Sequence, residues 1–267
     1  MLSEKITFPT QLRILPTAFN MRLGIIVVHN DPTPEMELWR QVIAPASIHT
    51  VRFKLPRNVG EVFIGSDIES LLEYYDLEKA LLTLRDIGVD AICLCFTSAS
   101  IFSGPSFDKD FIEHARRLTG CAHITTSAKA LVSELINQQH HTIAMIIPPW
   151  YSPETVEAFR NYFQHHGIVI PYSVPYQLTG KWEFIPRQDR FDAGAVWHIS
   201  PESIADCAFK QLKNERANFS AVIVPGSGFP SLEAGKIIRQ RLEKPYYSVN
   251  SASWSWFMSV CQQRKGV

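Results

Sequence analysis

The sequence predicts an α/β protein with mainly parallel sheets and helices on both faces. Three observations support this prediction. Short apolar runs alternate with amphipathic segments along the chain, which is the pattern of strands joined by crossover helices. The run at residues 91–96 is continuously apolar, as expected of a strand that is covered on both faces. The strand–helix order begins again near residue 142, so we expect two similar α/β halves.

The individual elements are predicted from local composition and from the turn and cap residues that bound each segment. Strands are expected where short runs rich in Val, Ile and Leu lie between turn residues. They are residues 23–28, 47–55, 91–96, 123–125, 142–147, 168–172, 221–224 and 246–249. Helices are expected where apolar residues recur at helical spacing, with Thr33 and Ser127 as two of the caps. They are residues 33–42, 68–87, 108–118, 127–138, 153–166, 201–214, 231–242 and 252–261.

The same pattern predicts the domain organisation. Residues 1–20 are expected to form a loose N-terminal extension, because a first strand follows at once. Residues 21–139 together with 248–267 are expected to form a first α/β lobe, and residues 140–247 a second.

An insertion at residues 177–196 interrupts the second lobe. It is long, polar and aromatic, and it contains Arg187 and Arg190. Loops longer than about 12–15 residues in compact domains are usually lids, binding loops or disordered segments. This segment is therefore either a lid or specificity loop, or a surface insertion without a chemical role.

Composition excludes several classes of protein. The chain has 267 residues, a formal net charge of zero, 46% hydrophobic and 19% charged residues. Without a basic stripe, nucleic acid is not an expected partner. No apolar run approaches the roughly 18 residues of a membrane span, so no membrane association is expected. The odd count of five cysteines favours free thiols in a reducing cytoplasm, and the first 20 residues lack a signal-peptide pattern.

The richest candidate site follows the strand at residues 91–96. Thr97, Ser98 and Ser100 arrive together at its carboxyl end, and Gly104 closes the segment. Ligands of open α/β sheets bind at that end of the strands. Small hydroxyls and free backbone N–H groups suit a carboxylate or an oxyanion.

Polar residues also follow the other strands, although turns favour such residues anyway. They include His29-Asn30-Asp31, Thr125-Thr126-Ser127, Trp150-Tyr151-Ser152, Gly226-Ser227-Gly228 and Asn250-Ser251 with Ser253. Six such ends in register predict a polar crevice. For Ser127 and Ser231, helix capping is the competing interpretation.

Other signals carry less weight. The first strand–helix turn lacks G-x-G-x-x-G, so no dinucleotide cofactor is expected. The pairs His140-His141 and His165-His166 do not place both rings on one helix face, so no metal site is expected. Cys93 and Cys95 share one face of a buried strand, which is a poor redox site.

At these strand ends the chain resembles the aspartate/glutamate racemase superfamily, in the branch of arylmalonate decarboxylase and maleate cis-trans isomerase. The residues that carry the resemblance are Arg22-Leu-Gly-Ile-Ile-Val with Glu35, Glu37 and Trp39, Gly88-Val-Asp-Ala-Ile with Thr97, Ser98, Ser100 and Gly104, Thr125 to Leu131, Tyr151-Ser-Pro-Glu154, Gly228 with Leu232-Glu-Ala234, and Asn250 to Ser253. The resemblance implies two pseudosymmetric Rossmann-like lobes with parallel four-stranded sheets and an active site in the cleft between them. It also implies chemistry without cofactor or metal, on a small carboxylic acid. A homo-oligomer is a separate expectation.

The resemblance assigns roles to the site residues and shows where this sequence differs from the family pattern. It implies that Thr97, Ser98 and Tyr151 hold a substrate carboxylate. The other expected substrate-binding residues around them are Phe96, Ser100, Gly226, Ser227, Gly228 and Asn250. The family reaction turns on cysteines, one from each lobe, and the two positions correspond here to Phe96 and Gly226. Neighbouring Cys95 would face the opposite side of the strand, and the Ser227 hydroxyl is a poor proton donor without assistance.

Two hypotheses follow. The first is an enzyme that isomerises, racemises or decarboxylates a small acid through an enolate-like intermediate. The proton would then move through His29, Asp31 or His198, with Tyr151 assisting. The second is a non-catalytic relative that keeps the carboxylate pocket as a sensor or partner subunit.

Overall fold

The computed structural model describes residues 21–42, 46–55, 61, 65, 71 and 75–265 of the chain. The expected N-terminal extension lies outside these residues, as does most of the first part of the helix expected at 68–87. The remainder of that helix is α3 (Tyr75–Ile87).

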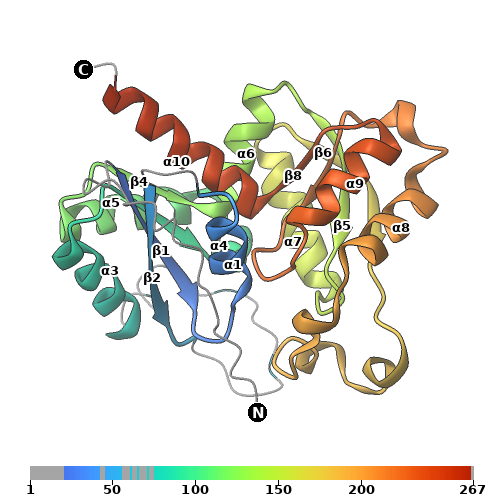
Figure 1. Ribbon diagram of the computed structural model, residues 1–267, viewed down its shortest axis with the longest axis horizontal. Coiled ribbons are helices and arrows are strands. Elements are labelled where there is room, and N and C mark those ends of the chain that lie inside the picture. Colours follow the sequence, from blue (N-terminus) through green and yellow to red (C-terminus); the bar gives the residue numbers. More distant parts are fainter. Residues whose placement is uncertain are drawn as a thin grey trace, which may run out of the picture.

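Two four-stranded parallel sheets form the framework (Figure 1). The first sheet has the order β2-β1-β3-β4 and the second the order β6-β5-β7-β8. The strands are β1 (Met21–Val28), β2 (Ala46–Phe53), β3 (Ala91–Cys95), β4 (His123–Thr126), β5 (Thr142–Ile147), β6 (Val169–Pro175), β7 (Ala221–Val224) and β8 (Tyr246–Ser248). The equivalent strand orders confirm the prediction of two pseudosymmetric α/β lobes.

Each central strand is buried on both faces, which explains its unbroken apolar sequence. In β1, Ile26 packs into one core while Ile25 and Val27 pack into the core on the other face. In β5, Ile146 and Met145 divide in the same way. This division is the physical consequence of the two-residue period of a strand.

Helices cover all four sheet faces. Helices α3 and α5 (Pro105–Thr119) cover one face of the first sheet, and α1 (Thr33–Trp39) and α10 (Val249–Lys265) the other. On the second sheet, α8 (Pro201–Leu212) and α9 (Leu232–Leu242) lie opposite α6 (Ser127–Asn137) and α7 (Pro153–His165).

Two helices cross between the lobes. Helix α6 precedes residue 140, yet Leu131 and Leu135 pack in the core of the second sheet. Helix α10 follows the second sheet, yet it extends to the first (Figure 1). There Trp254 and Phe257 pack into the core. The strands of the two sheets therefore fall on either side of residue 140, whereas α6 and α10 each pack against the sheet of the other half, and this exchange joins the lobes.

Several elements differ from the sequence prediction. Residues 97, 98 and 100 were expected in a turn, but they lie in a short helix, α4 (Thr97–Ser103). Gly104 separates α4 from α5 with a φ of 80°, a backbone conformation that glycine adopts readily, and Pro105 begins α5. Helix α6 is capped by Thr126, whose hydroxyl accepts a hydrogen bond from the Lys129 N–H at 3.1 Å, rather than by Ser127.

The insertion is ordered into three short 3₁₀ helices. They are η1 (Gly180–Phe184), η2 (Arg187–Asp189) and η3 (Ala195–His198), and a fourth, η4 (Arg216–Asn218), follows α8. Trp182 and Val196 anchor the insertion in the second lobe, where both are buried. Among the described residues, no helix combines the length and apolar character needed to cross a bilayer.

Candidate active site

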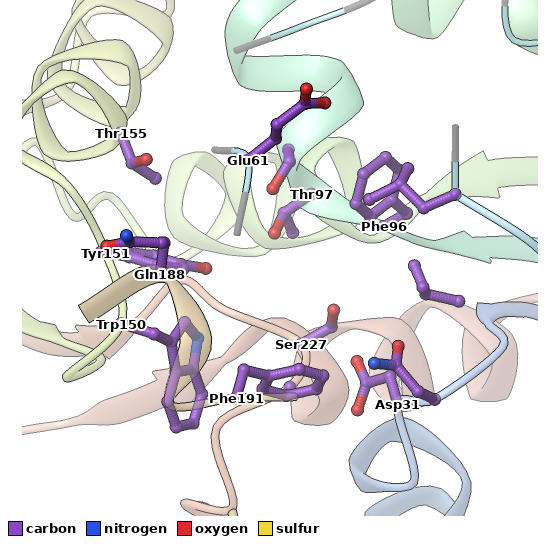
Figure 2. A pocket seen from close by; sticks show the side chains of 15 residues that line it. Asp31, Glu61, Phe96, Thr97, Trp150, Tyr151, Thr155, Gln188, Phe191 and Ser227 are labelled. Atoms are coloured by element: carbon purple, nitrogen blue, oxygen red, sulfur yellow. The ribbon is translucent and has the colours of Figure 1, made fainter. Parts of the chain in front are cut away.

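A cavity of about 150 Å³ lies where the carboxyl ends of the two sheets face each other (Figure 2). Its walls come from the turns after β1, β3, β5 and β7 and from the insertion. The lining residues are Val28, Asn30, Asp31, Leu55, Glu61, Phe96, Thr97, Ser98, Trp150, Tyr151, Thr155, Gln188, Phe191, Ser227 and Gly228. This location agrees with the rule that α/β proteins bind ligands at the carboxyl ends of their strands.

Three hydroxyls form one side of the cavity. Strand β3 ends at Cys95, and α4 then brings Thr97 and Ser98 to the cavity wall. Burial raises the pKa of the Tyr151 phenol, and the nearby Thr97 side chain opposes the shift. The phenol therefore keeps its proton at neutral pH and can donate a hydrogen bond to an anion.

Asp31 is the titratable group of the cavity with a pKa near neutrality. It lies in the turn between β1 and α1 and is 4% exposed. Its Oδ1 accepts a hydrogen bond from the Thr33 N–H at 3.0 Å. Burial raises the pKa of Asp31 to about 7, while the Thr33 N–H and the positive charge of Arg52 oppose the shift. A carboxyl group with this pKa can both give and take a proton near pH 7.

The turn after β7 completes the floor of the cavity. The Ser227 hydroxyl donates a hydrogen bond to the Cys95 carbonyl oxygen at 3.2 Å, which joins the two lobes. Gly228 lies against Asp31 and Phe191, since a Cβ there would be 3.1 Å from Asp31 Oδ2 and 2.8 Å from Phe191 Cε2. Figure 2 shows Asp31 and Ser227 on one side of the cavity and Phe96 and Thr97 on the other.

A buried carboxylate outside the cavity fixes this floor. Glu37 of α1 accepts hydrogen bonds from the N–H groups of Ser231 and Leu232, both at 2.6 Å, and from Asn250 Nδ2 at 2.8 Å. Asn250 Nδ2 also lies 3.0 Å from the Ser227 carbonyl oxygen. Asn250 therefore holds the turn from behind and does not line the cavity. Ser231 makes no side-chain cap for α9, because Glu37 takes that place.

The insertion closes the cavity from the outside. Gln188 and Phe191 line it, and the Phe191 ring packs edge-on against Trp150 with 5.1 Å between ring centroids. Asn30 Nδ2 of the first lobe donates a hydrogen bond to Asp192 Oδ1 of the insertion at 2.8 Å. This placement favours the lid or specificity loop over an insertion without a chemical role.

The two histidine candidates lie elsewhere. His29 is exposed, and it borders a separate surface depression beside Arg52 and Lys54. His198 is exposed at the end of η3, where its ring lies 5.1 Å from that of Trp182. Neither side chain lines the cavity. Of the three replacement acid/base candidates, the structure brings only Asp31 to the cavity.

Ser100 and Gly226 also occupy positions other than those expected. The Ser100 hydroxyl donates a hydrogen bond to Asp108 Oδ1 at 2.7 Å, and its side chain is fully buried away from the cavity. Gly226 lies behind Tyr151 rather than on the cavity surface. The hydrogen bond to Asp108 explains the difference for Ser100, because it directs the side chain toward α5.

Sequence reasoning assigned no role to eight of the lining side chains. Six of them carry no motif: Val28, Leu55, Glu61, Thr155, Gln188 and Phe191. Asn30 and Trp150 are predicted only as neighbours of Asp31 and Tyr151. The insertion was the available signal for two of them. Within the described parts of the chain, no three His, Cys, Asp or Glu side chains are grouped so that they could hold a metal ion.

The fold and the site together define a two-lobed α/β enzyme whose cavity lies between two parallel sheets. The chain belongs to the arylmalonate decarboxylase family, because the model of that family matches residues 73–265. No curated protein matches the sequence. The resemblance at the strand ends is thus confirmed at the level of the family.

Solved structures show the same fold at low sequence identity. Arylmalonate decarboxylase is 16% identical with a TM-score of 0.69, over 90% of this chain and 92% of that chain. The maleate isomerase Iso from Pseudomonas putida S16 is 21% identical with a TM-score of 0.72, over 91% and 93%. A Nocardia farcinica maleate cis-trans isomerase with a covalently bound succinylcysteine intermediate is 18% identical with a TM-score of 0.70, over 91% and 93%.

Proposed function

We propose that the protein decarboxylates a small malonate-type acid without a cofactor, and that Asp31 delivers the proton. The observation that supports this most directly is the position of the Asp31 carboxyl, whose pKa is about 7, in the same cavity as the hydroxyls of Thr97, Ser98 and Tyr151. One side of the cavity thus offers hydrogen-bond donors for an anion, and the other offers an acid.

In the proposed reaction, the hydroxyls of Thr97, Ser98 and Tyr151 bind one carboxylate of the substrate. The second carboxylate faces the apolar wall of Phe96 and Leu55, where a charge is poorly solvated. The bond from the α-carbon to that carboxylate breaks, CO₂ leaves, and the electron pair remains as an enediolate that the hydroxyls stabilise. The protonated Asp31 gives its proton to the α-carbon and regains one from water.

Decarboxylation is favoured over cis-trans isomerisation by the lining of the cavity. The Nocardia isomerase carries its intermediate on a cysteine, but none of the residues that line the cavity here is a cysteine. Cys95 is fully buried, and its hydrogen bond with Cys93 together with burial raises the pKa of its thiol. A thiolate for covalent addition is therefore missing from the cavity walls.

The cavity volume favours a small substrate. A cavity of about 150 Å³ in another protein holds a ligand the size of benzene, and this cavity has the same volume. Methylmalonate is of that size, whereas phenylmalonate requires the insertion to move.

The test is a substrate panel of malonate, methylmalonate, phenylmalonate, maleate and aspartate in D₂O, followed by NMR. We expect loss of CO₂ from methylmalonate with deuterium at the α-carbon, and a roughly 10²–10⁴-fold slower reaction for Asp31→Asn. Asp110→Asn is the matched control, because Asp110 is exposed on α5. Turnover of maleate alone would contradict the proposal.

The alternative is a non-catalytic carboxylate-binding relative, and the lack of a cysteine on the cavity walls is the observation in its favour. It predicts saturable binding of methylmalonate with neither CO₂ release nor α-proton exchange. Calorimetry on the wild-type protein, run beside the NMR panel, separates the two functions.

A further inference from the structure

A second cavity of about 530 Å³ shares Tyr151 with the first as a lining residue. The walls of the second cavity come from the proline-rich turn after β5, from the end of β6 and from the insertion. Pro148, Pro149 and Pro175 make much of this wall rigid.

One segment of the insertion separates the two cavities. Gln188 and Phe191 line the first cavity, while Arg187 and Arg190 line the second. The 3₁₀ helix η2 covers Arg187–Asp189, and side chains three residues apart point in the same direction in such a helix. Arg190 is the C-cap of η2, so Arg187 and Arg190 share one face of this turn, whereas Gln188 lies on another.

The two guanidinium groups have no carboxylate partner within salt-bridge distance in the described parts of the chain. Arg190 donates hydrogen bonds to the carbonyl oxygens of Ile185 at 3.1 Å and Pro149 at 3.2 Å, which fixes its orientation and leaves other N–H groups free. Arg187 is exposed, and its positive charge contributes to lowering the pKa of Glu154. Glu183 is the acidic residue of the lining, and its Oε1 accepts a hydrogen bond from the Gly180 N–H at 2.8 Å.

We propose that this second cavity binds a small carboxylate or phosphate anion through Arg187 and Arg190, at a site separate from the first cavity. Guanidinium groups bind both anions through paired N–H donors. We treat the ligand as a molecule separate from the substrate, because Tyr151 is the one described residue that the two linings share. An anion at both arginines also holds the segment that carries Gln188 and Phe191 in place over the first cavity.

The experiment is calorimetric titration of the full-length protein with citrate and with inorganic phosphate. We expect saturable binding that weakens roughly tenfold or more in Arg187→Gln, which breaks no intramolecular hydrogen bond described here, and also in Arg190→Gln. Arg239→Gln is the matched control, because Arg239 is exposed on α9 and lines neither cavity. Absence of saturable binding, or unchanged affinity in Arg187→Gln, would overturn the proposal.

A second arm tests whether the two sites are separate, and it does not depend on turnover. Citrate and phosphate affinity should persist in Thr97→Val. If Thr97→Val weakens anion binding as much as Arg187→Gln does, the titration reports the first cavity and the second site is rejected. Because the readout is binding, failure of the proposed decarboxylation leaves this result interpretable.

Discussion

The hydroxyl of Tyr151 occupies the space into which a side chain at Gly226 would project. A Cβ at position 226 would collide with the Tyr151 hydroxyl oxygen and would come within 3.1 Å of Tyr151 Cζ and Pro148 Cγ. A phenol from the turn after β5 therefore lies where the family resemblance implies a cysteine side chain from the turn after β7. The glycine is required by close approach and not by backbone conformation.

Gly226→Ala should lower the free energy of unfolding by about 1–3 kcal/mol, because an overpacked site must shift its neighbours. Tyr151→Phe removes the nearest colliding atom, so the double variant should recover part of the loss. Urea denaturation of both single variants and the double variant gives the coupling energy. Strictly additive effects would show that the two residues do not compete for this space.

Asp31→Asn should change the pH dependence of stability. The pKa of Asp31 is raised from 3.8 to about 7 in the folded protein. The folded state therefore binds more protons than the unfolded state between these pH values, and stability falls as the pH rises from about 4 through 7. The loss amounts to a few kcal/mol, on the order of 4 for a shift of this size.

The Asn variant keeps an acceptor for the Thr33 N–H and lacks the buried charge. Its unfolding free energy should be nearly flat over the same pH range and should exceed that of the wild type at pH 8. Urea denaturation at pH 5, 6, 7 and 8 measures both. Parallel pH profiles of the two proteins would mean that Asp31 does not titrate in this range.

Phe191→Ala should enlarge the first cavity and relax its size limit. The ring packs against Trp150 and approaches Gly228, so its removal opens space toward the insertion. Relative to the wild type, we expect kcat/KM for phenylmalonate to rise roughly tenfold against that for methylmalonate. Phe184→Ala is the control, because Phe184 lies in the same insertion but is 88% exposed. Equal effects of both variants would assign the change to a loosened insertion.

Asp108→Ala should destabilise the protein by about 3 kcal/mol or more. The Asp108 carboxylate accepts hydrogen bonds from the hydroxyls of Ser100 at 2.7 Å, Thr126 at 2.6 Å and Tyr162 at 2.5 Å. Removal of the carboxylate leaves three buried donors without a partner, whereas Ser100→Ala removes one donor and should cost about 1 kcal/mol. Thermal denaturation compares the two variants, and equal losses would contradict a shared network.

This network also has a positional consequence. It ties α4, which carries Thr97 and Ser98, to Tyr162 of α7. Asp108→Asn should therefore raise KM for methylmalonate more than it lowers kcat, because the carboxylate-binding hydroxyls shift while Asp31 stays in place. Steady-state kinetics on the proposed substrate provides the measurement.

The sequence was most informative where burial is imposed on both faces of a strand. The apolar runs that became β3 and β5 have no other stable environment, so they predict the parallel sheets and the order of the elements. It was least informative at α4, because Thr and Ser are typical of turns and only packing against α5 and α7 makes these residues helical.

Among the site residues, Thr97, Ser98, Asp31, Tyr151, Ser227 and Gly228 could be found from their positions at strand ends. Their candidate roles follow from their residue types and from their places directly after strands, both of which can be read from the local sequence. His29 and His198 have suitable chemistry but the wrong surroundings, and the sequence cannot report that both side chains are exposed. Exposure depends on segments far away in the chain.

By itself, the sequence determined the two α/β halves, the strand ends that carry hydroxyls and the resemblance to the arylmalonate decarboxylase family. Only the tertiary structure decided which acid faces those hydroxyls, because the pKa of Asp31 depends on burial by both lobes. It also decided that Tyr151 fills the space at Gly226 and that the insertion closes the cavity. The physical reason is the same in each case: periodicity and turn chemistry are local, whereas desolvation and steric exclusion arise from residues that meet only after folding.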